Sequence, residues 1–157
     1  MLDSEACLKK IQSLRHEGKK IIFTNGVFDI LHIGHLSLLE KAKSLGDILC
    51  VGINSDSSVK KIKGENRPVN QQEDRARLLA GFEVVDIVTI FHETTPSDII
   101  SRLKPDIHVK GGDYNPADFE NMPEAKVVRD YGGEVRIISL VPGKSSTAII
   151  NKMSFTI

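Results

Sequence analysis

The sequence predicts a doubly wound α/β fold, in which one mostly parallel, five-stranded sheet carries helices on both faces. Two observations lead to this prediction: five short apolar segments recur along the chain, and segments with helical start and stop signals separate them. The apolar segments are continuous rather than alternating with polar residues, which is typical of strands buried on both faces of a parallel sheet. Alternating strands and helices connect through right-handed crossovers, so we expect a Rossmann-like architecture.

The predicted strands and helices follow one another in a regular order. The five strands are expected at residues 20–25, 48–54, 85–91, 106–111 and 134–140. Helices are expected at 34–45, 74–82 and 97–103, with a last helix that opens at residues 145–147. Gly46 would stand just past the end of the first of these helices. Asn70 with Glu73 resembles a capping box, and Thr95 with Pro96 predicts a cap followed by a proline in the first helical position.

Composition indicates one globular domain of ordinary size. The 157 residues are 40% hydrophobic and include 21 basic and 21 acidic side chains, so no net charge attracts nucleic acid or a membrane surface. No apolar run approaches the roughly 20 residues of a membrane span, and the N-terminus lacks the features of a signal peptide. Cys7 and Cys50 match no metal or redox spacing. We expect a cytoplasmic, disulfide-free protein in which residues 1–157 form a single domain.

Polar and small residues gather after the ends of the predicted strands. They occupy residues 26–35, 54–57, 91–94, 110–113 and 141–144. Because the carboxyl ends of parallel strands share one edge of a sheet, these segments should lie close together. Ligands of doubly wound sheets bind at that edge, near the point where the strand order reverses.

The segment 26–35 reads Gly-Val-Phe-Asp-Ile-Leu-His-Ile-Gly-His and joins the first strand to its helix. The first backbone N–H groups of a helix lack internal partners, and the helix dipole favours an anion there. Histidines at such a place can donate to phosphate oxygens and carry positive charge when it is needed. Two imidazoles satisfied by backbone carbonyls are the alternative. With Gly26, Asp29 and Gly34 beside them, the pair favours nucleotide phosphate chemistry.

The pattern Gly-x-Phe-Asp-x-x-His-x-Gly-His resembles the signature of the cytidylyltransferase-like nucleotidyltransferase superfamily. Its last four letters, residues 32–35, also match the first signature of class I aminoacyl-tRNA synthetases, which share this fold. We expect no synthetase, because 157 residues leave no room for a tRNA-binding region and Lys152-Met153-Ser154 lies at the chain's end. Neither a complete P-loop nor a G-x-G-x-x-G dinucleotide motif is present.

A basic segment follows the second predicted strand. Residues 54–68 contain four cations, at Lys60, Lys61, Lys63 and Arg67. The segment is either a solvated charged loop or a mobile cationic loop that closes over a triphosphate. Arg75 stands in the first turn of the next helix, where a cation is disfavoured, so an anion ligand, an acidic neighbour or a surface salt bridge should balance it. The resemblance favours Arg75 over Arg77 as the functional arginine.

Two further segments suggest contacts with phosphate. Lys110 supplies a point charge, and the glycines after it permit close backbone approach, with a tight turn as the alternative. Residues 145–147 place hydroxyls at the start of the last helix, which is an ordinary cap or, by the resemblance, a contact to the β and γ phosphates. His92 ends a strand at this edge and is a candidate substrate contact. His108 lies within a strand and is interpreted as core.

Residues 103–114, Leu-Lys-Pro-Asp-Ile-His-Val-Lys-Gly-Gly-Asp-Tyr, resemble the adenylyltransferase half of bacterial bifunctional heptose-7-phosphate kinase/heptose-1-phosphate adenylyltransferases. The resemblance implies that ATP and D-glycero-D-manno-heptose 1-phosphate give ADP-heptose, for lipopolysaccharide or another surface glycan, and pyrophosphate. Mg²⁺ should accompany ATP and bridge its phosphates, with no dedicated protein ligand. A homodimer is expected by analogy with the superfamily.

The resemblance also distributes roles over the residues at this edge. Catalytic roles fall to His32, His35, Lys63 and Arg75. Nucleotide binding falls to Thr24, Asn25, Gly26, Phe28, Gly34, His35, Lys110, Gly111, Ser145, Ser146 and Thr147. Binding of the sugar phosphate falls to Asp29, Asn54, Asp56, Arg67 and Asp113. Two alternatives stay open: a cytidylyltransferase acting on glycerol 3-phosphate or another polyol phosphate, and a non-catalytic nucleotide-binding regulatory module.

Overall fold

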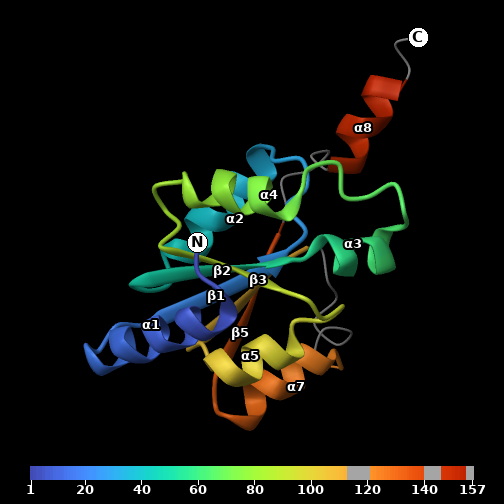
Figure 1. Cartoon of the computed structure of the whole chain (residues 1–157). Helices are drawn as coiled ribbons and strands as arrows, with labels where there is room; N and C mark the ends of the chain where they lie inside the picture. Colours follow the sequence, from blue (N-terminus) through green and yellow to red (C-terminus); the bar gives the residue numbers. More distant parts are fainter. Residues whose placement is uncertain (113–120, 140–145, 155–157) are drawn as a thin grey trace.

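The structure, a computed structural model of the chain, describes residues 1–112, 121–139 and 146–154. Its centre is a five-stranded sheet in the order β3-β2-β1-β4-β5 (Figure 1). The strands are β1 Ile21–Gly26, β2 Ile48–Asn54, β3 Ile87–Phe91, β4 Ile107–Gly111 and β5 Glu134–Ile138. All four strand pairings are parallel. The predicted fold class is therefore confirmed, and the sheet is parallel in each of its pairings rather than mostly so.

Helices cover both faces of the sheet. The described helices are α1 Ser4–His16, α2 Ile33–Lys43, α3 Asp56–Lys63, α4 Gln72–Ala80, α5 Ser97–Leu103, α7 Pro123–Asp130 and α8 Ser146–Ser154. In Figure 1, α2 and α4 lie above the sheet, α1, α5 and α7 lie below it, and α8 points away from the body. No helix in the described ranges is both long and apolar enough to cross a membrane.

The apolar core has two layers, because successive side chains of a strand point to opposite faces. Ile22 of β1 packs in the layer under α2 and α4, together with Leu39 and Leu79 of those helices. Phe23 packs in the other layer, with residues such as Ile11 and Ile100 from α1 and α5. Each fully buried side chain of this kind contributes about 1.5–3 kcal/mol relative to exposure. Burial on both faces explains why the strands read as continuous apolar runs.

Several local predictions differ from the structure. The segment predicted as a basic loop contains helix α3, whose start is capped by Ser55: its Oγ accepts from the N–H of Ser58 at 3.3 Å. The predicted capping box before α4 is wrong, because Gln71 is the N-cap residue and no side chain caps this helix. The side chain of Asn70 instead donates to the carbonyl of Asp29. Tertiary partners thus compete with local capping for the same polar groups.

Helix ends also shift by a few residues. Helix α2 ends at Lys43 with Ser44 as C-cap, so Gly46 lies beyond the expected position. A Cβ on Gly46 would stand 2.7 Å from Cδ1 of Ile22, so glycine there permits close packing on the sheet. Pro96 is the N-cap of α5, which has no side-chain cap, so the predicted cap at Thr95 is wrong.

The strand order defines where a ligand would lie. From β1 the chain runs outward through β2 to β3, then crosses back to β4 and continues to β5 on the other side. The order therefore reverses between β1 and β4, and a crevice opens beyond their carboxyl ends. The segment that follows β1 is the 26–35 signature, which places it at that crevice.

Candidate active site

The signature begins with a strained turn that shapes the support of the histidines. Phe28 has a φ of +49°, in the left-handed region, and its side chain is buried. A Cβ on Gly26 would stand 3.0 Å from the Phe28 ring, so a larger residue there would displace that ring. The Phe28 ring lies 5.2 Å, centroid to centroid, from the imidazole of His35. Gly26 and Phe28 thus act together to hold His35 against the end of β1.

The two imidazoles form one stacked unit at the start of α2. His32 is the N-cap residue, and its Nδ1 accepts a hydrogen bond from the Gly34 N–H at 3.1 Å. The backbone N–H of His32 donates to Nδ1 of His35 at 3.3 Å. The two rings stack with centroids 3.9 Å apart. Because Nδ1 accepts in both rings, a neutral imidazole at either position carries its proton on Nε2.

The backbone N–H groups of residues 34–36 are used within this helix start. The N–H of Gly34 donates to the His32 side chain, and the N–H groups of His35 and Leu36 donate to the His32 carbonyl at 2.9 and 3.4 Å. Contact of Gly34 with a nucleotide stays a prediction. The dipole of α2 favours an anion at this end.

His35 is held neutral. Burial lowers its pKa, and the nearby His32 lowers it further, to about 4. Two stacked imidazoles at a helix N-terminus disfavour added positive charge, since like charges would meet in a partly desolvated site. Whether this histidine gains a positive charge beside a bound phosphate, as the sequence suggested it could, stays a prediction. It acts as a neutral hydrogen-bond donor.

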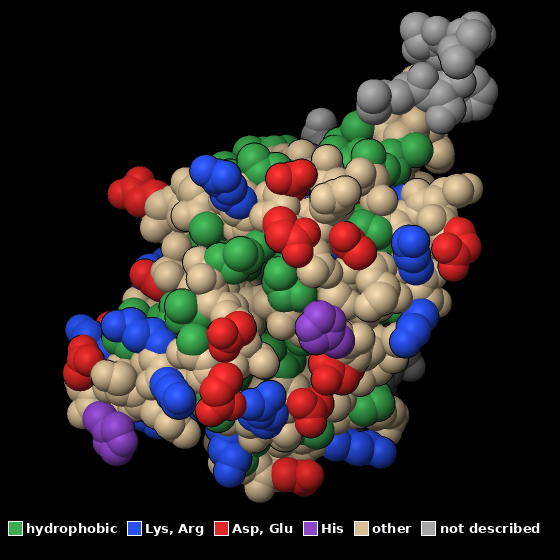
Figure 2. All heavy atoms as spheres, in the orientation of Figure 1, with side chains coloured by type: hydrophobic (Ala, Val, Ile, Leu, Met, Phe, Trp, Pro, Cys, Tyr) green, Lys and Arg blue, Asp and Glu red, His purple; other side chains and the backbone are tan. Residues whose placement is uncertain are grey.

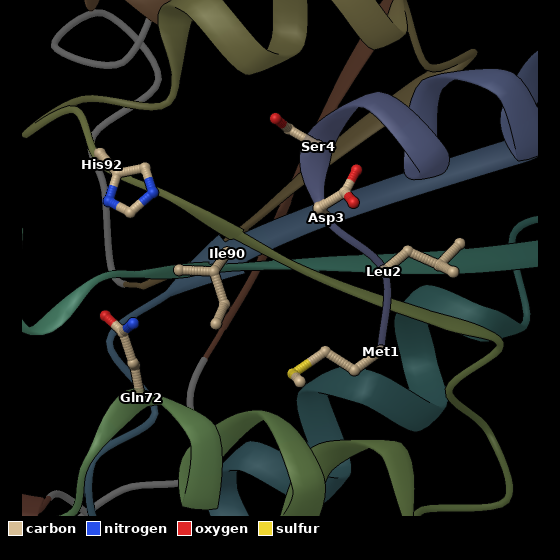
Figure 3. Close-up of a pocket in the computed structure, with 7 residues that line it drawn as sticks. All are labelled: Met1, Leu2, Asp3, Ser4, Gln72, Ile90 and His92. Carbon is tan, nitrogen blue, oxygen red and sulfur yellow. The ribbon is translucent and has the colours of Figure 1, made fainter.

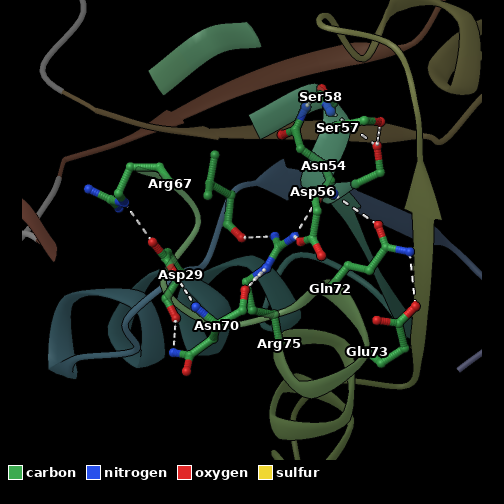
Figure 4. Close-up of polar contacts among 12 residues, drawn as sticks. Asp29, Asn54, Asp56, Ser57, Ser58, Arg67, Asn70, Gln72, Glu73 and Arg75 are labelled. Carbon is green, nitrogen blue, oxygen red and sulfur yellow. Dashed lines mark hydrogen bonds and ion pairs between the residues drawn. The ribbon is translucent and has the colours of Figure 1, made fainter. Parts of the chain in front are cut away.

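Asp29, predicted to bind the sugar phosphate or orient an imidazole, has its carboxylate bound by the segment before α4, and its contact with a substrate stays a prediction. Its carboxylate accepts from Nε of Arg67 at 2.7 Å and from the backbone N–H groups of Val69 and Asn70 at 2.9 Å (Figure 4). Burial raises the pKa of Asp29, but the hydrogen bonds from Asn70, Val69 and Arg67 outweigh it and the pKa lies below its usual value. Asp29 anchors the segment before α4 against the signature turn.

Arg75 has a structural role in the protein, while its catalytic role stays a prediction. Its side chain is fully buried, and its donors reach the carbonyls of Asn70, Val27 and Asn54 at 3.0, 2.6 and 2.9 Å (Figure 4). It also pairs with the Asp56 carboxylate at 2.7 Å. Of the alternatives predicted for this cation, the acidic neighbour is the one the structure contains. Arg75 joins the start of α4 to the ends of β1 and β2.

The polar residues after β2 are likewise used within the protein. The Asn54 amide is buried and donates to Oγ of Ser58 at 3.0 Å. One carboxylate oxygen of Asp56 accepts from Arg75, and the backbone N–H of Asp56 donates to the Gln72 side chain at 2.9 Å. These contacts hold α3 against α4. Binding of the sugar phosphate by Asn54 and Asp56 stays a prediction, and in the structure Asp56 is the partner of Arg75.

The basic residues of the 54–68 segment divide into two groups. Lys60, Lys61 and Lys63 are exposed on α3, and Lys60 lies 3.9 Å from Glu65. They occupy the last turn, where the helix dipole favours cations. Arg67 differs, because its side chain is largely buried and Asp29 ties it to the signature turn. Contacts of Lys63 and Arg67 with a ligand remain predictions.

The β4 side of the crevice is polar too. Thr24 is fully buried, and its hydroxyl donates to the Val109 carbonyl at 2.9 Å, so it links β1 to β4, and its contact with a nucleotide stays a prediction. Lys110 forms a largely buried ion pair with Glu124 of α7 at 2.8 Å. Burial raises the pKa of Glu124, but Lys110 outweighs it, and the pKa lies below its usual value. Gly111 ends β4 and is partly buried.

The start of α8 lies at the signature. The hydroxyl of Ser146 donates to the Ile30 carbonyl at 2.9 Å, across 116 positions of sequence, and Thr147 is exposed beside it. Ser146 is thereby tied to the signature, and its contact with phosphate stays a prediction. Ser145 and Asp113, also predicted as ligands, lie outside the described residues.

Sequence reasoning missed two polar partners at this edge. Glu124 was not considered, and His108 was interpreted only as core. His108 is indeed fully buried, but its Nε2 lies 3.0 Å from Oδ1 of Asn25, a predicted nucleotide ligand. The spacing of His108 and Lys110 along β4 offered a signal, because residues two apart in a strand share a face.

A separate pocket of about 280 Å³ lies elsewhere, at the β3 edge (Figure 3). It is lined by residues 1–4 together with Gln72, Ile90 and His92. None of the signature residues lines it. His92, the candidate substrate contact, lines this pocket, and its contact with a substrate stays a prediction.

The charge pattern and possible metal ligands are unremarkable in the described part of the chain. The face drawn in Figure 2 intersperses Lys and Arg with Asp and Glu. No three His, Cys, Asp or Glu side chains converge among residues 1–112, 121–139 and 146–154. The two carboxylates next to the signature, Asp29 and Asp56, already bind arginines.

Comparisons with known proteins agree with this geometry. The family model described as "Cytidylyltransferase-like" matches residues 23–152. The chain is 54% identical over 142 residues to the bifunctional protein HldE of Nitratiruptor sp., a match that covers 90% of this chain and 29% of that protein. It is 47% identical over 158 residues to HldE of Geobacter metallireducens, with 96% and 32% covered. The chain thus spans about a third of the length of these curated relatives.

A solved structure supports the fold. The lipopolysaccharide core biosynthesis protein from Thermoplasma volcanium aligns with a TM-score of 0.62 and 30% sequence identity. The alignment covers 78% of this chain and 97% of that one. That protein therefore shares the fold of this chain, and nearly all of its length lies within the alignment.

Proposed function

Because the chain belongs to the cytidylyltransferase-like family of nucleotidyltransferases, we propose that it transfers the adenylyl group of ATP to D-glycero-D-manno-heptose 1-phosphate. The products are ADP-heptose and pyrophosphate. The observation that carries this proposal is the stacked pair His32 and His35 at the start of α2, beside the crevice where the strand order reverses. The choice of sugar is supported by residues 103–114 and by the similarity to HldE proteins.

In the proposed reaction, a phosphate oxygen of the sugar phosphate attacks the α-phosphorus of ATP in line, and pyrophosphate leaves. No protein nucleophile is needed, so positioning and stabilisation of charge on the phosphoryl oxygens account for catalysis. The Nε2–H groups of His32 and His35 donate to those oxygens. Hydrogen bonds from neutral donors to a charged acceptor are worth about 1.5–3 kcal/mol each. Because His35 is neutral, it donates without having to be protonated first.

The start of α8 would bind the other end of the triphosphate. Ser146 is held at the signature by its bond to the Ile30 carbonyl, so the N-terminus of α8 lies near the imidazoles. Its dipole favours an anion there. We place the leaving pyrophosphate between this helix start and the exposed lysines of α3, with Lys63 as the candidate that neutralises it.

Mg²⁺ is proposed to enter with ATP. The family's reaction involves a nucleoside triphosphate and a divalent metal, and Mg²⁺ would neutralise charge on the phosphate oxygens when bound. Since Asp29 and Asp56 are engaged by arginines, phosphate oxygens and water would hold it, which suits an ion that retains several waters. A cytoplasmic homodimer is likewise a proposal, testable by sedimentation of the purified chain.

The test is a panel that measures pyrophosphate release. ATP and CTP are each combined with heptose 1-phosphate and with glycerol 3-phosphate, in the presence of Mg²⁺. The proposal expects release with ATP and heptose 1-phosphate and at least tenfold less with the other pairs. Preference for CTP and glycerol 3-phosphate would replace it with the cytidylyltransferase. ATP binding by calorimetry without release from any pair would identify a non-catalytic binding module.

A further inference from the structure

A buried polar pair joins β1 to β4 at the crevice. Nε2 of His108 lies 3.0 Å from Oδ1 of Asn25, and the His108 ring lies 5.9 Å from Phe23, its partner in the sheet register. Asn25 is the next-to-last residue of β1 and immediately precedes Gly26, where the signature begins. Asn25, Phe23 and His108 share the face of the sheet that α1, α5 and α7 cover, opposite to the face of α2.

The surroundings of His108 set its proton on the nitrogen that faces Asn25. Burial, with a smaller contribution from Lys110, lowers the His108 pKa to about 3, so the ring is neutral and has one N–H. Nδ1 is buried and has no hydrogen-bond partner among the described residues. A buried N–H without an acceptor is costly, whereas Nε2 has the amide oxygen of Asn25 within reach. His108 is therefore the donor and Oδ1 of Asn25 the acceptor.

The hydrogen bond to His108 determines which polar atoms of the Asn25 side chain are left to contact a ligand. With Oδ1 occupied, the amide is fixed in one of its two orientations, and its Nδ2 group points away from His108. No hydrogen bond from Nδ2 to a described residue accompanies this bond, and Asn25 is only partly buried. Two N–H donors thus remain at the carboxyl end of β1, directly before the signature.

Packing alone does not account for a histidine at position 108. The site is fully enclosed beside Phe23, and one ring nitrogen is left without a partner there. Burying an unsatisfied polar atom costs free energy that an apolar side chain of similar volume would not cost. The compensating interaction in the structure is the bond to Asn25.

We propose that His108 is a positioning residue for nucleotide binding: its imidazole N–H orients the Asn25 amide so that the two Nδ2 donors meet a phosphate oxygen of the bound nucleoside triphosphate. The inference rests on the proposed function, since it takes the crevice at β1 and β4 as the triphosphate site. Asn25 then contacts the substrate directly, and His108 acts through Asn25.

Four variants test the pair. His108→Met keeps the volume and removes the N–H, whereas His108→Gln places an amide N–H close to the position of Nε2. Asn25→Ala removes the donors themselves, and the fourth variant combines Asn25→Ala with His108→Met. For each, kcat and KM for ATP are measured by pyrophosphate release, ATP affinity by calorimetry, and Tm by thermal unfolding.

We expect His108→Met and Asn25→Ala each to weaken ATP affinity by about tenfold, the equivalent of one hydrogen bond to a charged group. The double variant should lose no more than either single variant, because both break the same interaction. His108→Gln should stay within about threefold of the unsubstituted protein. His108→Met should retain its Tm, because an apolar side chain suits the enclosed site.

Three results would overturn the inference. They are normal ATP affinity in Asn25→Ala, additive losses in the double variant, and equal losses in His108→Met and His108→Gln. The calorimetric measurement needs no acceptor, so it remains informative if the unsubstituted protein releases no pyrophosphate. In that case the adenylyl transfer fails, while the pattern of ATP affinities still decides the role of His108.

Discussion

Replacing His35 with alanine should slow pyrophosphate release by roughly 100- to 1,000-fold while weakening ATP binding less than about tenfold. In the proposed mechanism the Nε2–H of His35 donates to the reacting phosphate, and in the structure its ring stacks on His32 with centroids 3.9 Å apart. Removing one preorganised donor to a developing oxyanion typically costs about 2.7–4 kcal/mol in the transition state. The ground-state contact of a neutral imidazole with ATP is weaker, so most of the loss should fall on kcat.

The assay combines steady-state pyrophosphate release with ATP binding by calorimetry. His16→Ala is the matched control, because His16 is exposed at the end of α1 and should leave both quantities unchanged. Thermal unfolding of both variants separates a catalytic loss from a folding defect. Turnover of His35→Ala within threefold of normal would refute the mechanism. So would a rise in Kd as large as the fall in kcat, since the interaction would then be uniform binding.

Three further predictions follow from the same contacts. Because the His35 pKa is about 4 in the folded protein against an ordinary 6.5, NMR should show no titration of this ring between pH 5.5 and 8. The unfolded chain binds the His35 proton more tightly than the folded protein does, so the free energy of unfolding should fall as the pH drops from about 6.5 towards 4. A His35 ring that titrates near 6.5 would contradict both the NMR and the stability prediction. Arg75→Met should lower the free energy of unfolding by about 2–4 kcal/mol in chemical denaturation, because it leaves the Asp56 carboxylate and three carbonyls without their partner. The control Arg77→Met, at an exposed position, should change this free energy by less than about 0.5 kcal/mol. Similar losses in the two variants would count against the structural role of Arg75. Removal of divalent ions with EDTA should abolish pyrophosphate release but leave Tm within about 2 °C, because the described residues form no metal-binding cluster. A large fall in Tm would indicate an ion bound by the protein itself.

Asp29, Asn54 and Arg75 have one physical feature in common that sequence position does not reveal. Each was predicted to face a ligand because it stands at the active edge of the sheet. The structure shows their polar groups bound to partners 4 to 48 positions away, among them Arg67, Asn70 and Asp56. A charged residue at a strand end meets two demands, binding a ligand and joining the loops, and sequence position does not distinguish them.

Local sequence by itself determined the architecture and the place of the site. Continuous apolar runs predicted the five parallel strands, and the ten residues from Gly26 to His35 contain both the helix start and the imidazoles that border the crevice. The strands, the helix start and the signature depend on residues that are close together along the sequence. The tertiary structure alone decided which donors face outward, because each partner is distant: Thr24 bonds Val109, and His108, 83 positions from Asn25, holds its amide. Hydrogen-bond partners are chosen by proximity in space, which periodicity and spacing along the chain do not specify.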